Sequence, residues 1–428
     1  MSFTVFNLHS GLLRALDDME FSAPTAIQAD AIPPAMAGRD VLACAVTGSG
    51  KTAAFLLPIL HRLAGHRRAA TRALVLAPTR ELAAQIDEHR RHLARHVGVS
   101  GAAIFGGVGM EPQEQAFRRG ADVLVATPGR LLDHFRFPYA RLAGLEVLVL
   151  DEADRMLDMG FLPDIRRILG HLPRQRQTML LSATMPAPIV ELARDMLRDP
   201  ATINIERPAA PAAGITHTAY PAPAELKSRL LVELLKGPDV RSALAFTRTK
   251  HRANRLAEFL ARAGVQADRI HGNRSQSQRT QALAGFKAGR IRVLVATDIA
   301  ARGIDISELS HVINFDVPAV AEDYIHRVGR TARAEAVGDA ITLVSPAEEA
   351  DFRAIERAVG RRIPRVTLPG FDYTMRMAER LEVPLAERIA AIRVRRAEER
   401  ARGRAKAGPG WPTARKRPAD LRVTSRAV

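Results

Sequence analysis

The chain has 428 residues, 47% of them hydrophobic, and its 63 Lys and Arg against 46 Asp and Glu give a net charge of +17. That length favours more than one domain, and no stretch approaches the ~20 apolar residues of a membrane span. The N-terminus has neither the basic region nor the apolar core of a signal peptide, and the single cysteine, Cys44, excludes an internal disulfide. We therefore expect a cytoplasmic protein that binds polyanions, either nucleic acid or an anionic membrane surface.

Short aliphatic runs alternate with amphipathic, helix-like segments between about residues 25 and 205. This alternation predicts an α/β domain, residues 1–206, with a parallel sheet covered by helices on both faces. Its predicted strands are residues 40–44, 73–77, 102–105, 122–126, 147–150 and 178–181.

The Pro- and Ala-rich residues 207–214 predict a linker. The alternating pattern then resumes, so we expect a second α/β domain of similar size over residues 215–368. Its predicted strands are residues 242–247, 267–271, 291–296, 311–315 and 339–344.

The remaining residues, 369–428, form a basic tail. Residues 393–426 hold twelve Lys and Arg against three acidic residues. Apolar residues at helical spacing (Leu385, Ile389 and Ile392) predict a helix over 384–402, and the composition of residues 403–428 favours disorder.

A Gly-rich turn follows the first predicted strand, and residues 45–52 read Ala-Val-Thr-Gly-Ser-Gly-Lys-Thr. Such a turn binds polyphosphate through backbone N–H groups, places a Lys on the terminal phosphates and offers a hydroxyl to Mg²⁺. Ala45 stands where the usual pattern has its first Gly, so this motif alone leaves an ordinary strand-to-helix turn as the alternative.

A second motif, Asp151-Glu-Ala-Asp154, follows the aliphatic run of residues 147–150. A metal–phosphate site needs one carboxylate for Mg²⁺ and another to orient the attacking water. Acidic residues also suit a helix N-terminus, so this run alone is ambiguous. Together, in this order, the two motifs predict an ATPase.

The full series of motifs resembles that of the DEAD-box RNA helicases and extends over about residues 3–366. Residues 272–277 and 297–303 are most similar to the bacterial RhlE-like group. The resemblance implies two tandem RecA-like domains, with ATP in the cleft between them and RNA across both, in an ATP-dependent RNA helicase that unwinds short duplexes locally. The matching segments are residues 21–28, 45–52, 78–82, 106–107, 127–130, 151–154, 182–184, 246, 276–279, 296–305 and 326–333.

The resemblance also implies residue roles in catalysis. Lys51 neutralises the β- and γ-phosphates, and Thr52 with Asp151 holds Mg²⁺. Glu152 positions the attacking water. Arg330 and Arg333 act as arginine fingers from the second domain.

In the implied nucleotide site, Gln28 reads the adenine, Phe21 with Phe6 packs on the base, and Asp305 holds the ribose hydroxyls. Ser182, Thr184 and His326 couple this site to domain closure. The other implied ATP-binding residues are Ala45, Thr47, Gly48, Ser49, Gly50 and Gly303.

RNA is implied as the partner, held mainly through its backbone and with little sequence preference. Ribosomal precursors or RNA-decay proteins are further expected partners, and a monomer is expected. The implied RNA-binding residues are Thr79, Arg80, Gly107, Thr127, Arg130, Gly272, Gln276, Arg279 and Thr297.

The chain departs from the family pattern at Glu20, Ala26, Val46 and Ala332, none of which removes a charged catalytic group. Two other functions remain open. A related translocase acting on DNA is disfavoured by the Gln28 cluster. A non-enzymatic RNA clamp is disfavoured because binding alone has no need of the water-positioning Glu152.

Overall fold

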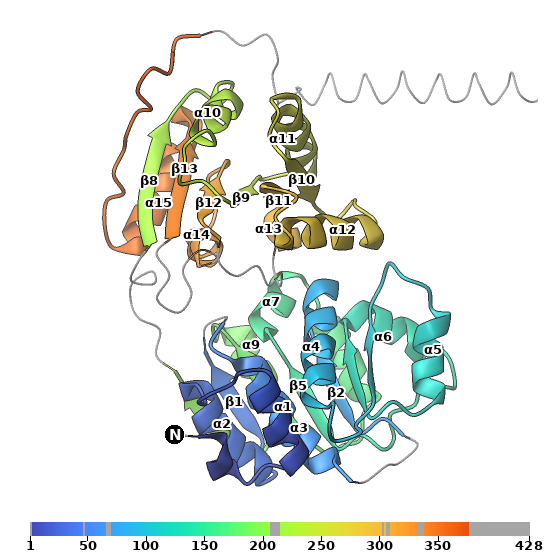
Figure 1. The fold of residues 1–428 in the computed structure, drawn as a ribbon. Helices are drawn as coiled ribbons and strands as arrows, with labels where there is room; N and C mark the ends of the chain where they lie inside the picture. The colour runs from blue at the N-terminus through green and yellow to red at the C-terminus, as the bar shows by residue number, and fades with distance from the viewer. Residues whose placement is uncertain are drawn as a thin grey trace, which may run out of the picture. The chain divides into compact units, whose positions relative to one another are not determined.

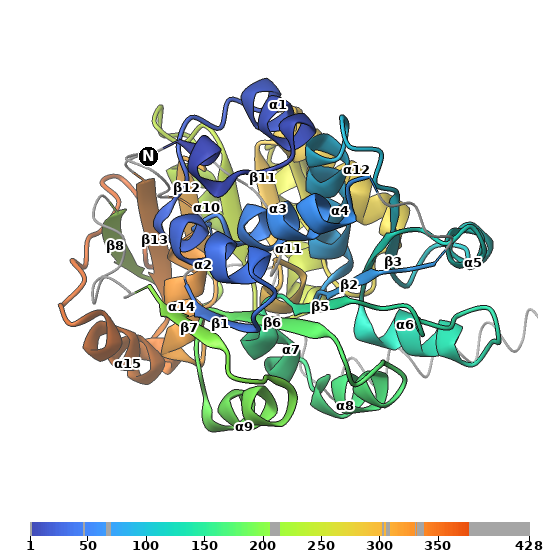
Figure 2. The same ribbon diagram turned by 90° about the horizontal axis from the view of Figure 1, so that it is seen from below.

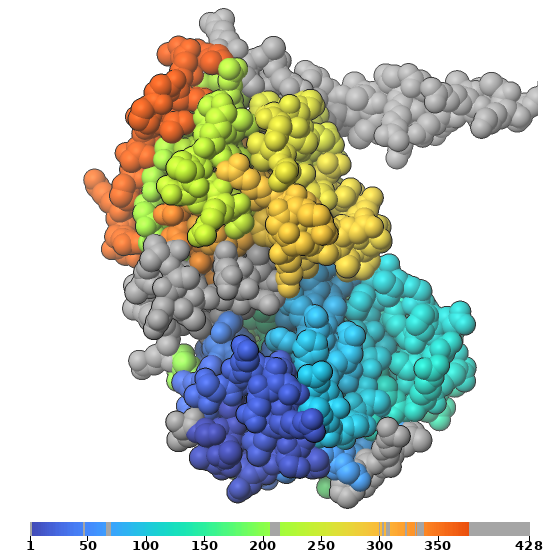
Figure 3. Space-filling view, in the orientation of Figure 1, coloured from blue at the N-terminus to red at the C-terminus, as the bar shows by residue number. Residues whose placement is uncertain are grey.

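The computed structural model describes residues 2–45, 48–65, 70–205, 215–301, 304, 309–329, 331 and 338–375, which lie within one compact unit, Met1–Arg376. Two parallel sheets are each flanked by helices, as expected (Figure 1). In the space-filling view the residues of the first sheet and its helices are blue to green, and those of the second sheet and its helices are lime to orange (Figure 3). No helix among the described residues is both long and apolar enough to cross a membrane.

The first sheet has seven strands in the order β3-β4-β2-β5-β6-β1-β7, and all the pairings between them are parallel. The six runs predicted from the sequence form six of these strands. The seventh, β7, was not predicted, because this short edge strand lacks a continuous aliphatic run. The strands are β1 (Val41–Cys44), β2 (Ala73–Leu76), β3 (Gly101–Ile104), β4 (Val123–Ala126), β5 (Val147–Leu150), β6 (Gln177–Ser182) and β7 (Ala201–Asn204).

Helices cover both faces of this sheet, with α3 and α4 on one face and α7, α8 and α9 on the other (Figure 2). Successive strand residues point to opposite faces, so Val75 packs in one apolar cluster while Leu74 and Leu76 pack in the other. Both faces of the strands are therefore buried. The helices are η1 (Phe3–Phe6), α1 (Ser10–Asp18), α2 (Ala26–Met36), α3 (Lys51–Leu63), α4 (Arg80–Leu93), α5 (Glu111–Arg118), α6 (Pro128–Phe135), α7 (Ala153–Asp158), α8 (Leu162–Gly170) and α9 (Ala187–Met196).

The second sheet has six parallel strands in the order β10-β11-β9-β12-β13-β8. Its first strand, β8, was missed because polar residues alternate with apolar ones along it. The strands are β8 (Ile215–Pro221), β9 (Ala243–Phe246), β10 (Ala267–Ile270), β11 (Val293–Ala296), β12 (His311–Asn314) and β13 (Gly338–Val344). The helices are α10 (Lys227–Leu234), α11 (Lys250–Arg262), α12 (Gln276–Lys287), α13 (Asp298–Ala301), α14 (Ala321–Val328), η2 (Pro346–Glu348) and α15 (Glu349–Val359).

Several sequence predictions concern residues outside the described part of the chain. The predicted linker, residues 207–214, falls between the last strand of the first sheet and the first strand of the second. The predicted helix over residues 384–402 and the basic segment after it also lie outside the described residues. Five implied site residues also lie outside the described residues: Thr47, Gly303, Asp305, Arg330 and Arg333.

Candidate nucleotide site and nucleic-acid interface

The order of strands in the first sheet separates the motifs into two groups along one edge. Adjacent strands β5, β6 and β1 end at Asp151, at Ser182 and at the Gly-rich turn. Adjacent strands β3, β4 and β2 lead into Gly106–Gly107, Thr127 and Thr79. Ligands of parallel α/β sheets bind at the carboxyl ends of the strands. The fold thus places the implied ATP residues on one half of this edge and the implied RNA residues on the other.

The Gly-rich turn runs directly into helix α3, whose first residue is Lys51. The Lys51 side chain is buried and its Nζ donates to the carbonyl oxygen of Ala45 at 2.7 Å. Gly50 has φ +96°, and a Cβ there would lie 2.5 Å from Nε2 of Gln28. The turn therefore requires glycine at position 50. The buried ammonium group of Lys51 is directed at the backbone of the turn.

Gln28 ties this turn to the start of helix α2. Its Oε1 accepts from the backbone N–H of Thr25 at 2.9 Å, which completes a capping box, and its Nε2 donates to the carbonyl oxygen of Gly50 at 3.1 Å. An amide both donates and accepts. Gln28 thus fixes the position of the turn, whatever contact it makes with a base.

Beside Gln28, the two aromatic residues that were implied to pack on the base both lie next to Phe3. Phe21 is partly exposed and lies next to the ring of Phe3, with 6.4 Å between their centroids. Phe6, which was expected to pack on the base, is 8% exposed and packs edge-on against Phe3. Phe3, which was not singled out from the sequence, is 3% exposed and packs between the two implied rings.

Asp151, at the end of β5, is 3% exposed, and its Oδ1 has no hydrogen-bond partner within the described residues. Burial, opposed by the Lys51 ammonium and reinforced by the Glu152 carboxylate, raises the pKa of Asp151 to about 7. A buried carboxylate oxygen without a partner is costly unless a cation completes it. Because Mg²⁺ takes oxygen ligands from one or two carboxylates plus phosphates and water, Asp151 fits this ion.

Glu152 follows in a left-handed backbone conformation, with φ 55° and ψ 51°. Its Oε2 accepts from Nη1 of Arg155 at 2.9 Å, and both side chains are 5% exposed. Left-handed backbone at a non-glycine residue is strained and clusters at functional sites. Arg155 has no distinguishing feature in the sequence beyond its place three residues after Glu152.

Asp154 links the end of β5 to the segment after β6. Its Oδ2 accepts from the backbone N–H groups of Ala183 and Thr184, at 3.2 and 2.8 Å, and from the Thr184 hydroxyl at 2.8 Å. Its own N–H donates to Oγ of Ser182, whose hydroxyl donates to the carbonyl oxygen of Thr184. The two implied coupling residues of the first domain are therefore hydrogen-bonded to the acidic motif.

In the second domain, Arg327 of α14 is the centre of a buried hydrogen-bond network. Its Nε and Nη2 donate to the two carboxylate oxygens of Asp298 at 2.6 and 2.8 Å, and its Nη1 donates to Asn314 Oδ1 and the Asp316 carbonyl oxygen. This fork fixes the last turn of α14, which carries the implied coupling residue His326. Sequence reasoning assigned Arg327 no role, because a basic residue at helical spacing also fits a solvated face.

The implied RNA residues of the first domain surround the Gly106–Gly107 turn. Gly107 has φ +84°, and a Cβ there would lie 2.1 Å from Nη1 of Arg80. Nη1 of Arg130 donates to the carbonyl oxygen of Val108 at 3.1 Å. Two arginines therefore converge on a turn that only glycine allows. Thr79 and Thr127 are the N-caps of α4 and α6.

In the second domain the implied RNA residues occupy different positions. Gly272 follows β10 with open space around its Cα, and Thr297 lies at the end of β11. Gln276 and Arg279, on α12, instead contact Glu81 of α4. Arg279 donates to both carboxylate oxygens of Glu81 at 2.8 Å and is only 9% exposed, while Gln276 Nε2 donates to Glu81 Oε1 at 3.1 Å.

Comparison with known proteins gives consistent matches. The DEAD/DEAH box helicase model matches residues 25–192, and the helicase conserved C-terminal domain model matches residues 226–335. The chain is 40% identical over 388 residues to the DEAD-box ATP-dependent RNA helicase CshA of Bacillus cereus (strain ATCC 10987 / NRS 248), covering 91% of this chain and 73% of that protein. It is 44% identical over 367 residues to the ATP-dependent RNA helicase SrmB of Escherichia coli (strain K12), covering 85% of this chain and 82% of that protein. The narrower similarity to the RhlE-like group stays a prediction.

Among solved structures, S. cerevisiae Dbp5 bound to RNA and ADP BeF3 matches with a TM-score of 0.77 and 31% sequence identity. The match covers 86% of this chain and 95% of that one. The tandem RecA-like architecture expected from the motifs is confirmed by this match and by the two parallel sheets.

Proposed function

Because the chain belongs to the DEAD-box family of ATP-dependent RNA helicases, we propose that the carboxyl ends of β1, β5 and β6 hold the nucleotide and perform its hydrolysis. The observation that carries this assignment is the buried Oδ1 of Asp151, which lacks a hydrogen-bond partner within the described residues, at the start of the acidic motif. Asp151 and the Thr52 hydroxyl would hold Mg²⁺. When bound, Mg²⁺ neutralises charge on the β- and γ-phosphates.

Lys51 would exchange one partner for another when ATP binds. Its ammonium group is buried and hydrogen-bonded to the Ala45 carbonyl oxygen, so it is already desolvated and aimed into the turn. A phosphate oxygen is a stronger, charge-assisted acceptor than a carbonyl. Binding therefore does not require this side chain to leave water. The rest of the turn, Gly48, Ser49 and Gly50, would contribute backbone N–H groups to the phosphates.

Glu152 would orient the attacking water. Its Oε2 is bound to Arg155, which leaves Oε1 for the water, and the guanidinium holds the carboxylate in one rotamer. Catalysis here depends on positioning, because phosphoryl transfer leaves little covalent chemistry for the protein. Arg330 and Arg333 would supply the positive charge that stabilises the transferring phosphoryl group.

Gln28 and Phe21 would contact adenine, and Asp305 the ribose. Gln28 keeps one amide proton and one lone pair free for a base edge after its bonds to Gly50 and Thr25. Ala45, Thr47 and Gly303 would make the remaining contacts to the nucleotide.

RNA would cross the other half of the same edge, over Thr79, Arg80, Gly107, Thr127 and Arg130. The paired glycines and two arginines suit backbone phosphates and 2′-hydroxyls rather than base edges, so sequence preference should be weak. Gly272 and Thr297 would continue this path. Gln276 and Arg279 hold Glu81 and would join the two halves of the path.

The excess of basic over acidic residues supports RNA as the partner, because a net charge of +17 favours binding to a polyanion. A cytoplasmic location and a monomeric state complete the proposal, with ribosomal precursors or RNA-decay proteins as the cellular partners. The single Cys44 suits a reducing compartment.

The test is ATP hydrolysis by the purified full chain, with and without single-stranded RNA. We expect RNA to stimulate hydrolysis, and Glu152→Gln to bind ATP and RNA while losing turnover. Equal turnover in Glu152→Gln and the unmodified protein would refute the assigned site. Equal stimulation by single-stranded DNA would favour a translocase acting on DNA.

A further inference from the structure

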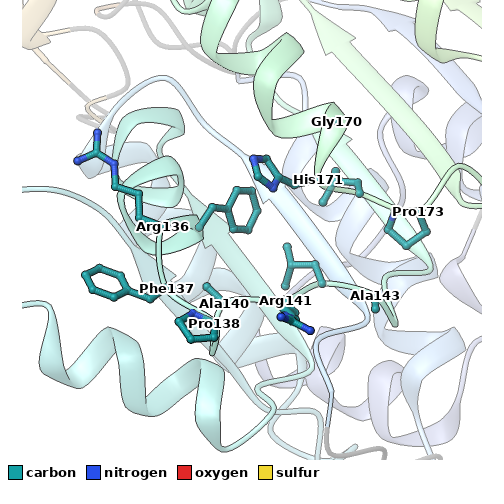
Figure 4. A pocket seen from close by; sticks show the side chains of 12 residues that line it. Arg136, Phe137, Pro138, Ala140, Arg141, Ala143, Gly170, His171 and Pro173 are labelled. Atoms are coloured by element: carbon teal, nitrogen blue, oxygen red, sulfur yellow. The ribbon is translucent and has the colours of Figure 1, made fainter.

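A hollow of about 670 Å³ lies between the segments that follow α6 and α8. Figure 4 shows Pro138 on one side of it and His171 and Pro173 on the other, with the Phe137 ring at the outer margin of the group. These segments lead into the first residues of β5 and β6. The hollow therefore lies at the amino ends of the strands, the edge opposite to the proposed ATP and RNA sites.

The ionisable side chains that line this hollow are all basic. Arg136, Arg141 and His171 line it, and no Asp or Glu is among its described lining residues. The Arg136 side chain is 75% exposed, and the nearest carboxylate to it, Asp133, is 3.9 Å away and itself 51% exposed. Such a loose exposed pair contributes little, so Arg136 can take a phosphate in its place, and Arg141 is itself exposed.

An aromatic platform stands at the rim of the hollow. Phe137 is 46% exposed and stacks on Tyr139, with ring centroids 5.5 Å apart and planes within 5°. Tyr139 is fixed in turn, because its hydroxyl lies 2.9 Å from Nδ1 of the buried His134 and the Arg118 guanidinium covers its ring at 5.1 Å. Stacking on Tyr139 uses one face of the Phe137 ring and leaves the other for a ligand.

We propose that this hollow is a second binding site for single-stranded RNA, in which a base stacks on Phe137 and the flanking phosphates pair with Arg136 and Arg141. Exposed rings beside arginines are the combination that binds single strands without sequence preference. A small anion would use the arginines but not the ring, whereas a nucleotide uses both.

The proposal of this second site depends on the RNA path proposed above, and the second site extends that path. Helix α6 connects the two, with Thr127 at its N-cap and the hollow beyond its last residue, Phe135. Eight helical residues span about 12 Å, so a strand leaving Thr127 and Arg130 has a second contact within reach. The hollow should matter only for RNA that is longer than the first path.

The test measures the affinity of the full chain for two oligouridylates, one of about eight nucleotides and one about three times longer. The short RNA lies within the usual site size of a single-strand binder and the long RNA exceeds it. The variants are Phe137→Ala and the double change Arg136→Ala/Arg141→Ala. The matched control is Arg14→Ala/Arg91→Ala, which removes the same charge from exposed positions on α1 and α4.

We expect Phe137→Ala to weaken binding of the long RNA about fivefold, the low end of one lost base stack. The double variant should also lower the slope of log K against log salt by about 0.7 for each lost phosphate contact, and the control should lower it less. All variants should bind the short RNA and show its ATPase stimulation unchanged, which also shows that they are folded.

Long-RNA affinities and slopes that are equal in the variants and the control would overturn the second site. Failure of the unmodified chain to bind the short RNA would instead refute the proposed function itself.

Discussion

Asp154 and Thr184 are joined by two hydrogen bonds to one oxygen, because the backbone N–H and the hydroxyl of Thr184 both donate to Oδ2 of Asp154 at 2.8 Å. Asp154 is the second residue of α7, the helix after β5, and Thr184 follows β6. The pair therefore ties the acidic motif to the segment after the neighbouring strand. A shift at one strand end would therefore be transmitted to the other through this carboxylate oxygen and through the bond from the Asp154 N–H to Ser182 Oγ.

Thr184→Val keeps the shape of the side chain and removes only the hydroxyl. We expect the free energy of unfolding to fall by about 1–2 kcal/mol, since two N–H groups still satisfy the carboxylate. ATP hydrolysis should persist while duplex unwinding per ATP falls, because the link between the two segments is weakened. Parallel ATPase and strand-displacement assays measure the ratio, with Thr184→Ser, which keeps the hydroxyl, as the control. An unchanged ratio in the valine variant would remove Thr184 from coupling.

Arg155→Met tests whether the guanidinium positions Glu152. Breaking a buried ion pair should cost about 3–5 kcal/mol of stability, so kcat is measured on protein shown to be folded by circular dichroism. We expect kcat to fall about 100-fold from misplacement of the carboxylate, with KM for ATP little changed.

Two further variants separate positioning from a structural role. Arg155→Lys keeps a charge near Glu152 and should recover part of kcat. In a Glu152→Gln background, Arg155→Met should cause no additional loss, because the group it orients is already gone. Independent, additive losses would show that Arg155 acts on something other than Glu152.

The sheets and their motifs could be predicted from the sequence because buried parallel strands are continuous aliphatic runs and ligand residues follow their ends. The two missed strands, β7 and β8, are edge strands with exposed polar positions and therefore lack that signal. Arg279 was expected to contact RNA, yet in the structure it forms a two-point ion pair with Glu81, a partner 198 positions away. Sequence spacing cannot show such a pairing. Arg327 was missed for the same reason, because its partner Asp298 lies 29 positions away. Arg155 was missed although Glu152 is only three positions away, because the sequence does not show that both side chains are buried.

His217 predicts an acid sensitivity of the second sheet. It lies on β8 with its Nδ1 2.7 Å from the Tyr324 hydroxyl, and burial lowers its pKa from 6.5 to about 4. The unfolded chain therefore binds a proton near pH 6.5 that the folded chain refuses until about pH 4. The stability that neutral His217 contributes is complete above pH 6.5 and is lost as the pH falls from 6.5 to 4.

His217→Gln cannot take up that proton and can still hydrogen-bond Tyr324. Urea midpoints at a series of pH values from 7 to 4 should therefore fall less steeply in this variant than in the unmodified chain. The variant is expected to be less stable at pH 7, where packing is lost, so the slope rather than the midpoint is the readout. Parallel slopes in the two proteins would exclude His217 as a source of acid sensitivity.

The basic tail is expected to add RNA affinity without contributing to catalysis. Contacts of the last described residues set where it can be removed: the backbone N–H of Leu368 donates to the Tyr373 hydroxyl at 2.8 Å, and the Tyr373 ring packs edge-on against Phe371. A chain ending at Met375 keeps these contacts, whereas one ending at residue 372 loses them. Removing residues 376–428 should leave an RNA-stimulated ATPase, because the motifs of the ATP site all precede residue 334.

RNA affinity of the shortened chain should be lower and its salt dependence flatter, by about 0.7 in the slope of log K against log salt for each lost phosphate contact with single strands. Twelve Lys and Arg between residues 393 and 426 set the upper limit. A full-length control with residues 393–428 in scrambled order keeps the charge and should keep the slope, because counterion release is independent of sequence. Equal slopes in the shortened and complete chains would show that the tail does not bind RNA. A loss of ATPase activity in the absence of RNA would show instead that the segment predicted as a helix, residues 384–402, is part of the folded second domain.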